Sequence, residues 1–522
     1  MSNNPVQRFI DRGLTITNNK RLTSQTWQDY IEGTKGKKIY VWGMGALTDI
    51  FFTREKDIVL SGAIDKSVSK QGKPISLYVD VSVENDCLIS SDTIFMDCKA
   101  EEIAVVIASA EYTDEIASTL DSIGIHNYYS ILHMEANSLY DKCDIVSSDV
   151  DYEIDNNKIV IWAHGGSYGG HEKYICEKLL ELRNNLDIVW ITSDMSIDVP
   201  NGIRLVFMGN KKRYSKEFKT AKIWITSSMI PREIKKKKNQ IFIEVKHWAS
   251  ITLKKFYLDA PLVGNIQFNQ EHWSEKGAEM DYIFVGSEFD EQSCRRGFSN
   301  TAEFIHIGSC RTDVMFKEEK IKEKVCAQYG IDEKDRIILY APTYRFKKNG
   351  ASESHIVGNI NIDLVRLVDS LQKKYQCKWK VLLRLHPCVR TSGEMFLQSE
   401  DIIDASEYPD SQELCATCDM LISDYSSIMF EPAFVRKPVL LYAPDRESYI
   451  DKEYELLINY DDLPFPIAKT NEELSSNISE FDYEKYVENV NEFMDKYGVY
   501  EDGHASVRAA RFISNLIDRK DD

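Results

Sequence analysis

Short apolar runs rich in β-branched residues alternate with helical patterns over almost the whole chain. This alternation is typical of β-α units arranged around largely parallel sheets. The sequence therefore predicts an α/β fold. The predicted strands cover residues 38–42, 60–65, 92–96, 103–108, 159–163, 188–192, 223–226, 241–245, 282–285, 337–340, 380–384, 420–423 and 439–442.

These strands form three groups, and a chain of 522 residues is too long for a single hydrophobic core. Residues 1–150 have the length and rhythm of a small Rossmann-like domain, and the acidic stretch 144–155 reads as a linker. The second and third groups lie in residues 151–310 and 311–522. Two successive α/β domains predict a cleft between them, because open α/β sheets bind ligands at the carboxyl ends of their strands.

Charge and cysteine content narrow the function. The formal net charge of -19 argues against a broad nucleic-acid surface. The lysine run 235–238 fits a solvated turn or a contact with anionic lipid headgroups. The N-terminus has no apolar signal region and no apolar stretch reaches about 18 residues, so we expect a cytoplasmic protein whose only membrane contact is peripheral. Cys415 and Cys418 alone have metal-like spacing, without a second pair or a histidine cluster, so no metal or cofactor is expected.

Three strand ends in the last domain carry phosphate-compatible side chains. Residues 421–432 (LISDYSSIMFEP) predict a strand, a polar turn and a helix start, where free backbone N–H groups can bind a diphosphate. The alternative is that Ser426 only caps the helix. Residues 384–387 (RLHP) combine an arginine with a histidine that can exchange a proton near neutral pH. Residues 339–345 (LYAPTYR) bring a hydroxyl and a cation to the same sheet end. The alternatives are that His386 is a structural histidine and that residues 339–345 form an ordinary loop.

The middle domain contributes two further segments. Residues 244–256 (EVKHWASITLKKF) follow a strand, which places His247 just beyond the strand end and facing the predicted cleft. Residues 164–171 (HGGSYGGH) join a strand to a helix, and their small side chains would let a polymer or a phosphate approach the backbone. Tight turning explains these glycines equally well.

The N-terminal segment 43–48 (GMGALT) resembles part of a dinucleotide-binding fingerprint. Asp65 follows about twenty residues later, as the fingerprint requires, but Thr48 occupies the third glycine position. An incomplete fingerprint is a weak signal for a nucleotide site.

Taken together, the motifs resemble the CDP-glycerol glycerophosphotransferase family, whose members build teichoic acids and related capsule polymers. The resemblance covers about residues 155–480. It implies a GT-B-like pair of Rossmann-type domains, a CDP-polyol donor, release of CMP and chemistry without an obligatory metal. It rests on residues 340–345, 384–387, 424–427 and 436–439, and on variants of two family segments at 308–313 (GSCRTD) and 461–466 (DDLPFP).

The resemblance also implies roles for individual residues. His386 would serve in catalysis and hold the donor diphosphate together with the serine pair. The implied donor-binding residues are Thr343, Arg345, Arg384, Asp424, Ser426 and Ser427, and the further candidates are Lys254, Arg311, Asp313, Gly166 and Ser167.

One departure from the family concerns the base. The family motif WHGTPLKK aligns through residues 253–255 and places Ala249 where the base histidine belongs. His247 lies two positions earlier, and residues two apart in an extended chain point to the same side. We therefore hypothesise that His247 is the base.

Three readings of the function stay open on the sequence alone. The first is transfer from CDP-glycerol, CDP-ribitol or another CDP-alditol to a polymer or lipid-linked acceptor at the inner membrane face, with no nucleic-acid partner. The second is a GT-B glycosyltransferase that uses a nucleotide sugar. The third is a non-catalytic nucleotide-binding scaffold that uses the region around Gly43.

Overall fold

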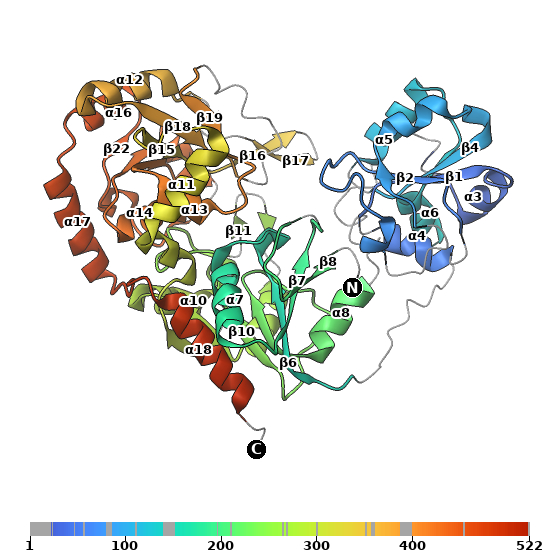
Figure 1. Ribbon diagram of the computed structural model, residues 1–522, viewed down its shortest axis with the longest axis horizontal. Coiled ribbons are helices and arrows are strands. Elements are labelled where there is room, and N and C mark those ends of the chain that lie inside the picture. Colours follow the sequence, from blue (N-terminus) through green and yellow to red (C-terminus); the bar gives the residue numbers. More distant parts are fainter. Residues whose placement is uncertain are drawn as a thin grey trace.

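Three parallel sheets organise the protein (Figure 1). The computed structural model describes residues 22, 24–45, 47–55, 58–79, 86–109, 112–138, 152–195, 197–208, 211–260, 262–263, 266–267, 270–298, 301–349, 352–356, 361–386, 399–452 and 455–519. The sheets follow one another along the chain and are separate, so the predicted α/β fold with parallel sheets is confirmed.

The N-terminal sheet has the strand order β3-β2-β1-β4-β5, with all pairs parallel. Its core joins that of the next unit, since the rings of Tyr78 and Phe207 lie 5.1 Å apart. The strands are β1 (Lys38–Trp42), β2 (Gly62–Ile64), β3 (Ile89–Ser90), β4 (Ile103–Ile107) and β5 (Tyr128–Ser130), and the helices are α3 (Trp27–Gly33), α4 (Thr48–Arg54), α5 (Thr113–Ser122) and α6 (Ile131–Ser138).

One predicted strand of this unit is wrong. Residues 92–96 form part of a 3₁₀ helix, η2 (Asp92–Asp97). Phe95 packs on the rings of Tyr40 and Trp42, whereas the neighbouring Met96 is 82% exposed. The apolar run therefore does not lie along a sheet.

The middle sheet has seven strands in the order β14-β13-β10-β9-β6-β7-β8, with all pairs parallel. Strand β9 is buried along its whole length, as expected for a central strand covered on both faces. The strands are β6 (Asp155–Trp162), β7 (Asp187–Thr192), β8 (Ile203–Phe207), β9 (Ala221–Thr226), β10 (Ile241–Glu244), β13 (Tyr282–Val285) and β14 (Glu303–His306), and the helices are α7 (Gly170–Leu182), α8 (Lys211–Thr220), α9 (Gln270–Glu279) and α10 (Glu288–Gly297).

The third sheet has six strands in the order β19-β18-β15-β20-β21-β22, again all parallel. The strands are β15 (Arg336–Tyr340), β18 (Trp379–Leu383), β19 (Ile402–Asp404), β20 (Met420–Ser423), β21 (Val439–Tyr442) and β22 (Ile467–Ala468). The helices are α11 (Glu318–Tyr329), α12 (Leu364–Tyr375), α13 (Ser411–Thr417), α14 (Phe430–Phe434), α15 (Arg446–Lys452), α16 (Asn471–Ser479), α17 (Tyr483–Lys496) and α18 (Ala505–Asp518). Two antiparallel ribbons complete the described strands, β11 (Leu262–Val263) with β12 (Ile266–Gln267) and β16 (Arg345–Asn349) with β17 (Ser352–Ile356).

The last helix returns to the middle unit. Helix α17 runs along the third sheet, and α18 then packs beside α7 and the 3₁₀ helix η6 (Cys310–Phe316) (Figure 1). Its buried positions Ala505, Ala509, Ile513 and Leu516 are spaced three or four apart and form one helical face. The chain thus crosses between the two units a second time.

A buried ionic cluster joins the middle and third units. Lys173 of α7 donates to Asp410, the N-cap of α13, at 2.6 Å and to Glu413 within α13 at 2.7 Å. Burial alone would raise the pKa of Glu413, but hydrogen bonds from Lys173, Lys324 and Tyr408 hold it at about 2. The cluster is satisfied only while the two units are docked.

The lysine run 235–238 is not an open basic patch. Lys235 pairs with Glu275, Lys236 pairs with Asp281, and Lys237 donates to a backbone carbonyl. Lys235 and Lys238 are exposed, so the choice between a solvated turn and a lipid contact stays a prediction. No helix within the described part of the chain is long and apolar enough to cross a bilayer.

We predict that Lys173→Met lowers the free energy of unfolding by about 3–5 kcal/mol, because it leaves the buried Asp410 without a cation and Glu413 with only Lys324. Urea denaturation of the full chain measures this change. Lys178→Met on the same helix is the matched control, since Lys178 pairs only with the exposed Glu181, and it should shift stability by less than about 1 kcal/mol. Equal effects of the two substitutions would contradict the structural role of the cluster.

Candidate active site

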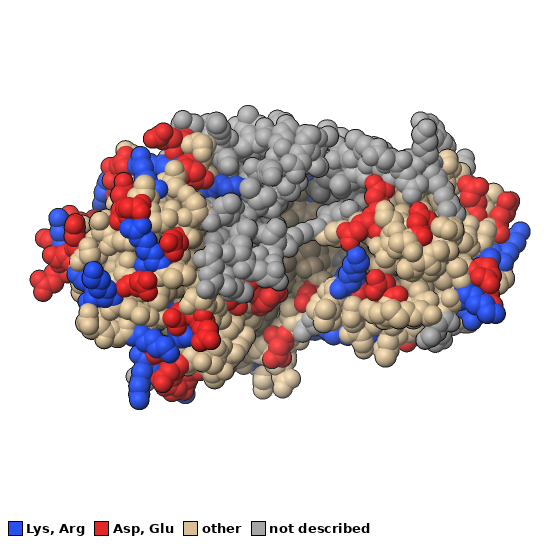
Figure 2. All heavy atoms as spheres, turned by 90° about the horizontal axis from the view of Figure 1, so that it is seen from above, with Lys and Arg blue, Asp and Glu red and all other residues tan. Residues whose placement is uncertain are grey.

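The carboxyl ends of the middle and third sheets face each other. Ser427, which follows β20, accepts a hydrogen bond from the Leu253 amide at 3.2 Å and lies 3.2 Å from the Thr252 hydroxyl of the middle unit. Viewed from above, the surface is hollowed between the part with the third sheet and the N-terminal part (Figure 2). The facing strand ends confirm the arrangement that the strand pattern predicted.

Two histidines of the middle unit stack at this edge. The rings of His164, which follows β6, and His247, which follows β10, have centroids 4.5 Å apart and planes inclined by 19°. Ser227 holds both: its hydroxyl accepts from the His164 amide at 3.0 Å, and its carbonyl lies 3.3 Å from Nδ1 of His247. A carbonyl only accepts, so Nδ1 carries the proton and Nε2 of the neutral ring is the proton acceptor.

The surroundings favour the neutral form of His247. Burial, the neighbouring His164 and the guanidinium of Arg311 all lower its pKa well below the usual value. Its side chain is nevertheless exposed to solvent, and we use the term recess for the space beside it, which His386 of the third unit also faces. A neutral, reachable imidazole is what a general base requires.

A strained backbone directs His247 to the recess. Lys246 has φ 65°, and its ammonium is paired with the buried Asp290. Asp290 also accepts from the Trp248 indole and the Gly286 amide, each at 3.1 Å. Because of this turn the chain is not extended, and Ala249 is fully buried while His247 is exposed. The expectation that these two residues point to the same side is therefore wrong, although His247 does reach the recess.

The sequence did not identify Glu172 or His164. Glu172 in the first turn of α7 is 1% exposed, and burial raises its pKa to about 7 while a hydrogen bond with Ser227 lowers it. Its Oε1 has no hydrogen-bond partner within the described chain. The position of Glu172 just after the turn 164–170 could have indicated a site residue, but Glu is common in the first turn of helices and is therefore not a specific signal.

In the third unit, the buried carboxylate of Asp424 binds two other predicted donor-binding residues, Thr343 and Arg345. Asp424 accepts from the amide of Thr343 at 2.9 Å and from its hydroxyl at 2.6 Å. Arg345 donates to Asp424 at 3.0 Å and to Asp445 at 2.7 Å. The polar groups of these three residues are thus engaged with one another, and their direct contact with phosphate stays a prediction.

Arg384 is also turned inward. It donates to the carbonyls of Ala405 and Ser406 beyond β19, and burial lowers its pKa. Its assignment as a phosphate clamp stays a prediction. His386 is half-buried, its ring lies 4.5 Å from that of Tyr344, and it lowers the pKa of His247 across the recess.

The serine turn differs from the predicted helix start. Ser426 caps the 3₁₀ helix η8 (Ser427–Met429), accepting from the Ile428 amide at 3.4 Å. Helix α14 that follows has only five residues, so a long helix dipole is absent from this described segment. Ser426 therefore does cap this turn, and its binding of the donor stays a prediction, while Ser427 lies at the junction of the two units.

The further candidates separate into structural and recess-facing residues. Asp313 accepts from the amides of Ala505 at 3.0 Å and Ser506 at 2.7 Å and so caps α18, a structural role that the sequence did not indicate. Lys254 donates to the Tyr449 hydroxyl at 2.6 Å. Gly166 has φ 73°, and a side chain there would collide with the Ser193 amide, which confirms tight turning. The exposed Ser167 follows it in the same loop.

The N-terminal fingerprint is closed by its own contacts. Asp65 accepts from the Met44 amide and from Lys70, both at 2.9 Å, and from the Ser67 amide at 2.9 Å. The carboxylate that would bind a ribose is thus used within its own loop. This argues against the scaffold reading in which this region binds a nucleotide.

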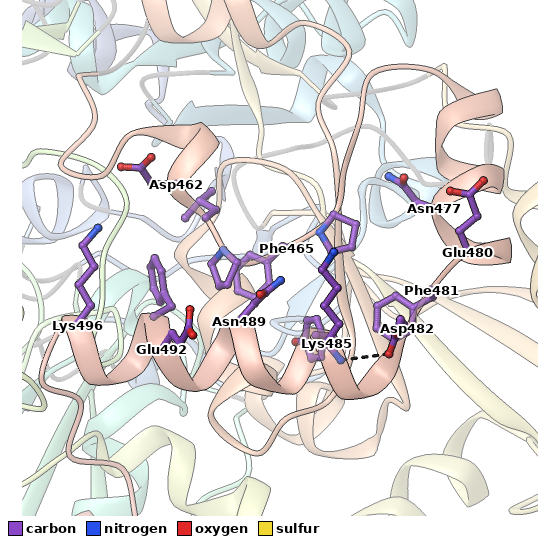
Figure 3. Close-up of a pocket in the computed structure, with 15 residues that line it drawn as sticks. Asp462, Phe465, Asn477, Glu480, Phe481, Asp482, Lys485, Asn489, Glu492 and Lys496 are labelled. Atoms are coloured by element: carbon purple, nitrogen blue, oxygen red, sulfur yellow. Dashed lines mark hydrogen bonds between the residues drawn. The ribbon is translucent and has the colours of Figure 1, made fainter.

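A separate groove of about 570 Å³ lies between residues 462–466 and α17 (Figure 3). Phe465 and Phe481 line it together with the charged side chains of Lys485, Glu492 and Lys496. It contains none of the predicted catalytic or donor-binding residues. The described residues also include no group of three or more potential metal ligands of the His, Cys, Asp and Glu types.

Comparison with known proteins agrees with this geometry. The model of the CDP-Glycerol:Poly(glycerophosphate) glycerophosphotransferase family matches residues 146–515. The teichoic acid poly(glycerol phosphate) polymerase of Bacillus spizizenii is 27% identical over 370 residues, which cover 67% of this chain and 90% of that protein. The teichoic acid glycerol-phosphate transferase of Staphylococcus aureus is 25% identical with the same coverage. A structure of the wall teichoic acid polymerase TagF superposes with a TM-score of 0.61 at 25% identity, covering 71% of this chain and 91% of that chain.

We predict that Asp313→Ala lowers the free energy of unfolding by about 1–2 kcal/mol through loss of the α18 cap. Thermal unfolding of the full chain measures the change. Glu333→Ala serves as the control, because Glu333 is exposed, and it should be neutral. An unchanged stability of the Asp313 variant would contradict the capping role.

Proposed function

Since the chain belongs to the CDP-glycerol:poly(glycerophosphate) glycerophosphotransferase family, we propose that its facing sheets move glycerol phosphate from CDP-glycerol to a hydroxyl of a teichoic acid chain. The chain is thus a polyol-phosphate transferase. The observation that carries the residue assignment is the neutral His247, held by Ser227 at the recess between the two units.

In the proposed reaction the acceptor oxygen attacks the phosphorus that carries glycerol. The new O–P bond forms as the bond from this phosphorus to the bridging oxygen breaks, and CMP departs with that oxygen. The hydroxyl proton passes to Nε2 of His247. Such chemistry depends mainly on positioning and on stabilisation of phosphate charge.

The donor side is proposed to consist of His386, Ser426 and Ser427. His386 can donate a hydrogen bond to a phosphate oxygen, and Ser427 lies where the two units meet. Asp424 and Arg345 hold the strand ends on which these residues stand.

The unit boundaries are also part of the proposal. Residues 151–310 form the acceptor-side domain and 311–522 the donor-side domain of a GT-B-like pair, with α18 packed back on the acceptor side. The strand order of the N-terminal sheet supports a Rossmann-like domain in residues 1–150. A lipid-linked acceptor would bring the protein to the inner membrane face.

We predict that the full chain, given CDP-glycerol and a glycerol-phosphate oligomer, releases CMP and lengthens the oligomer by glycerol phosphate. Chromatography of the nucleotide and mass spectrometry of the oligomer measure both products. A parallel reaction with CDP-ribitol tests the choice of polyol, and UDP-sugars test the glycosyltransferase alternative. Release of a nucleoside diphosphate instead of CMP would contradict phosphotransfer.

We predict that His247→Gln lowers kcat for CMP release by about 10²–10⁴-fold, the usual contribution of a general base. The KM for CDP-glycerol should change little, because the base acts on the acceptor. His272→Gln is the control and should keep normal turnover, since His272 lies on α9 and its ring contacts the backbone carbonyl of Ile230. Near-normal turnover of the His247 variant, with loss of turnover in His386→Ala, would show that the base is elsewhere.

A further inference from the structure

One guanidinium connects the base loop with the donor side. Arg311 in η6 donates through Nη1 to the carbonyl of His247 at 2.5 Å. Its Nη2 lies 3.1 Å from Oε1 of Glu431 in α14, with side-chain exposures of 11% and 2%. The two contacts come from different units, so the arginine spans their interface.

Glu431 is fixed independently of this arginine. Its carboxylate also accepts a hydrogen bond from the side-chain amide of Gln412 on α13 at 3.0 Å. It lies four residues after Ser427, so its position follows that of the donor-side turn. Arginine suits the connection, because its planar fork reaches two separate acceptors whereas lysine presents a single ammonium.

The charge of Arg311 also acts on the histidines. The groups facing His247 are His164 after β6, His171 on α7, Arg311 from η6 and His386 after β18, together with the Ser227 carbonyl after β9. Two carboxyls belong to the same region. Burial raises the pKa of Glu172 on α7 to about 7 and of Glu244 on β10 to about 8, so neither carries a full negative charge near neutral pH.

We propose that Arg311 is a positioning residue that sets the backbone of His247 against the donor-side Glu431, so that the base is aligned only when the two units are docked. This inference rests on the proposed function of His247. It differs from the sequence-based assignment, in which Arg311 was a further candidate for contact with the substrate.

The test compares kcat and its pH dependence for CMP release by the full chain. In Arg311→Gln we expect kcat to fall at least tenfold and its acid limb to move up by about one pH unit, because loss of the cation raises the pKa of His247 and activity requires the neutral ring. In Arg311→Lys the charge is kept, so kcat should fall while the acid limb stays in place. Glu431→Gln should likewise lower kcat without raising the acid limb.

Arg232→Gln is the matched control, because Arg232 pairs with Glu275 on the surface of the middle unit, and it should resemble the unchanged protein. If Arg311→Gln fails to fold, the lysine and Glu431 variants still decide the question. Wild-type kcat in both would overturn the proposal, as would an unmoved acid limb in a folded Arg311→Gln. A raised KM for CDP-glycerol with unchanged kcat would also overturn it, since Arg311 would then bind the donor. If the unchanged protein releases no CMP, the proposed function fails instead.

Discussion

The bonding of Lys173 to Asp410 and Glu413 is the constraint on which the site depends. An ammonium and two carboxylates removed from water are tolerated only when each is paired, so the middle and third sheets cannot separate here without exposing or stranding charge. The crossing of α18 back onto α7 adds an apolar contact to the same junction. Residues from two units can therefore face each other at fixed positions.

Within each unit a second buried carboxylate shapes the loop that faces the recess. Asp290 binds Lys246 and the Trp248 indole and so turns the chain after β10. Asp424 gathers Thr343 and Arg345 at the ends of β15 and β20. Several charged residues of the sequence motifs thus hold these loops in place.

The strand pattern predicted the fold well, because parallel strands buried on both faces are recorded directly as apolar runs. Strands 282–285, 420–423 and 439–442 have the predicted bounds. Side-chain partners could not be predicted in the same way. Arg345 contacts Asp445, about 100 positions away, and Asp313 caps α18, about 190 positions away. Local sequence does not contain that information. The position of His247 was predicted, but for a reason that the positive φ of Lys246 overturns.

Under the proposed assignment, His247 supplies the base although Ala249 occupies the position of the family histidine. At Ala249 the chain is packed in the core, so a histidine there would need a different loop. The turn at Lys246 instead delivers His247 against His164, and two stacked imidazoles cannot both take a proton without repulsion. Arg311 adds further positive potential. The neutral form is thereby favoured before reaction, and the proton gained during transfer is readily released, as a base that must turn over requires.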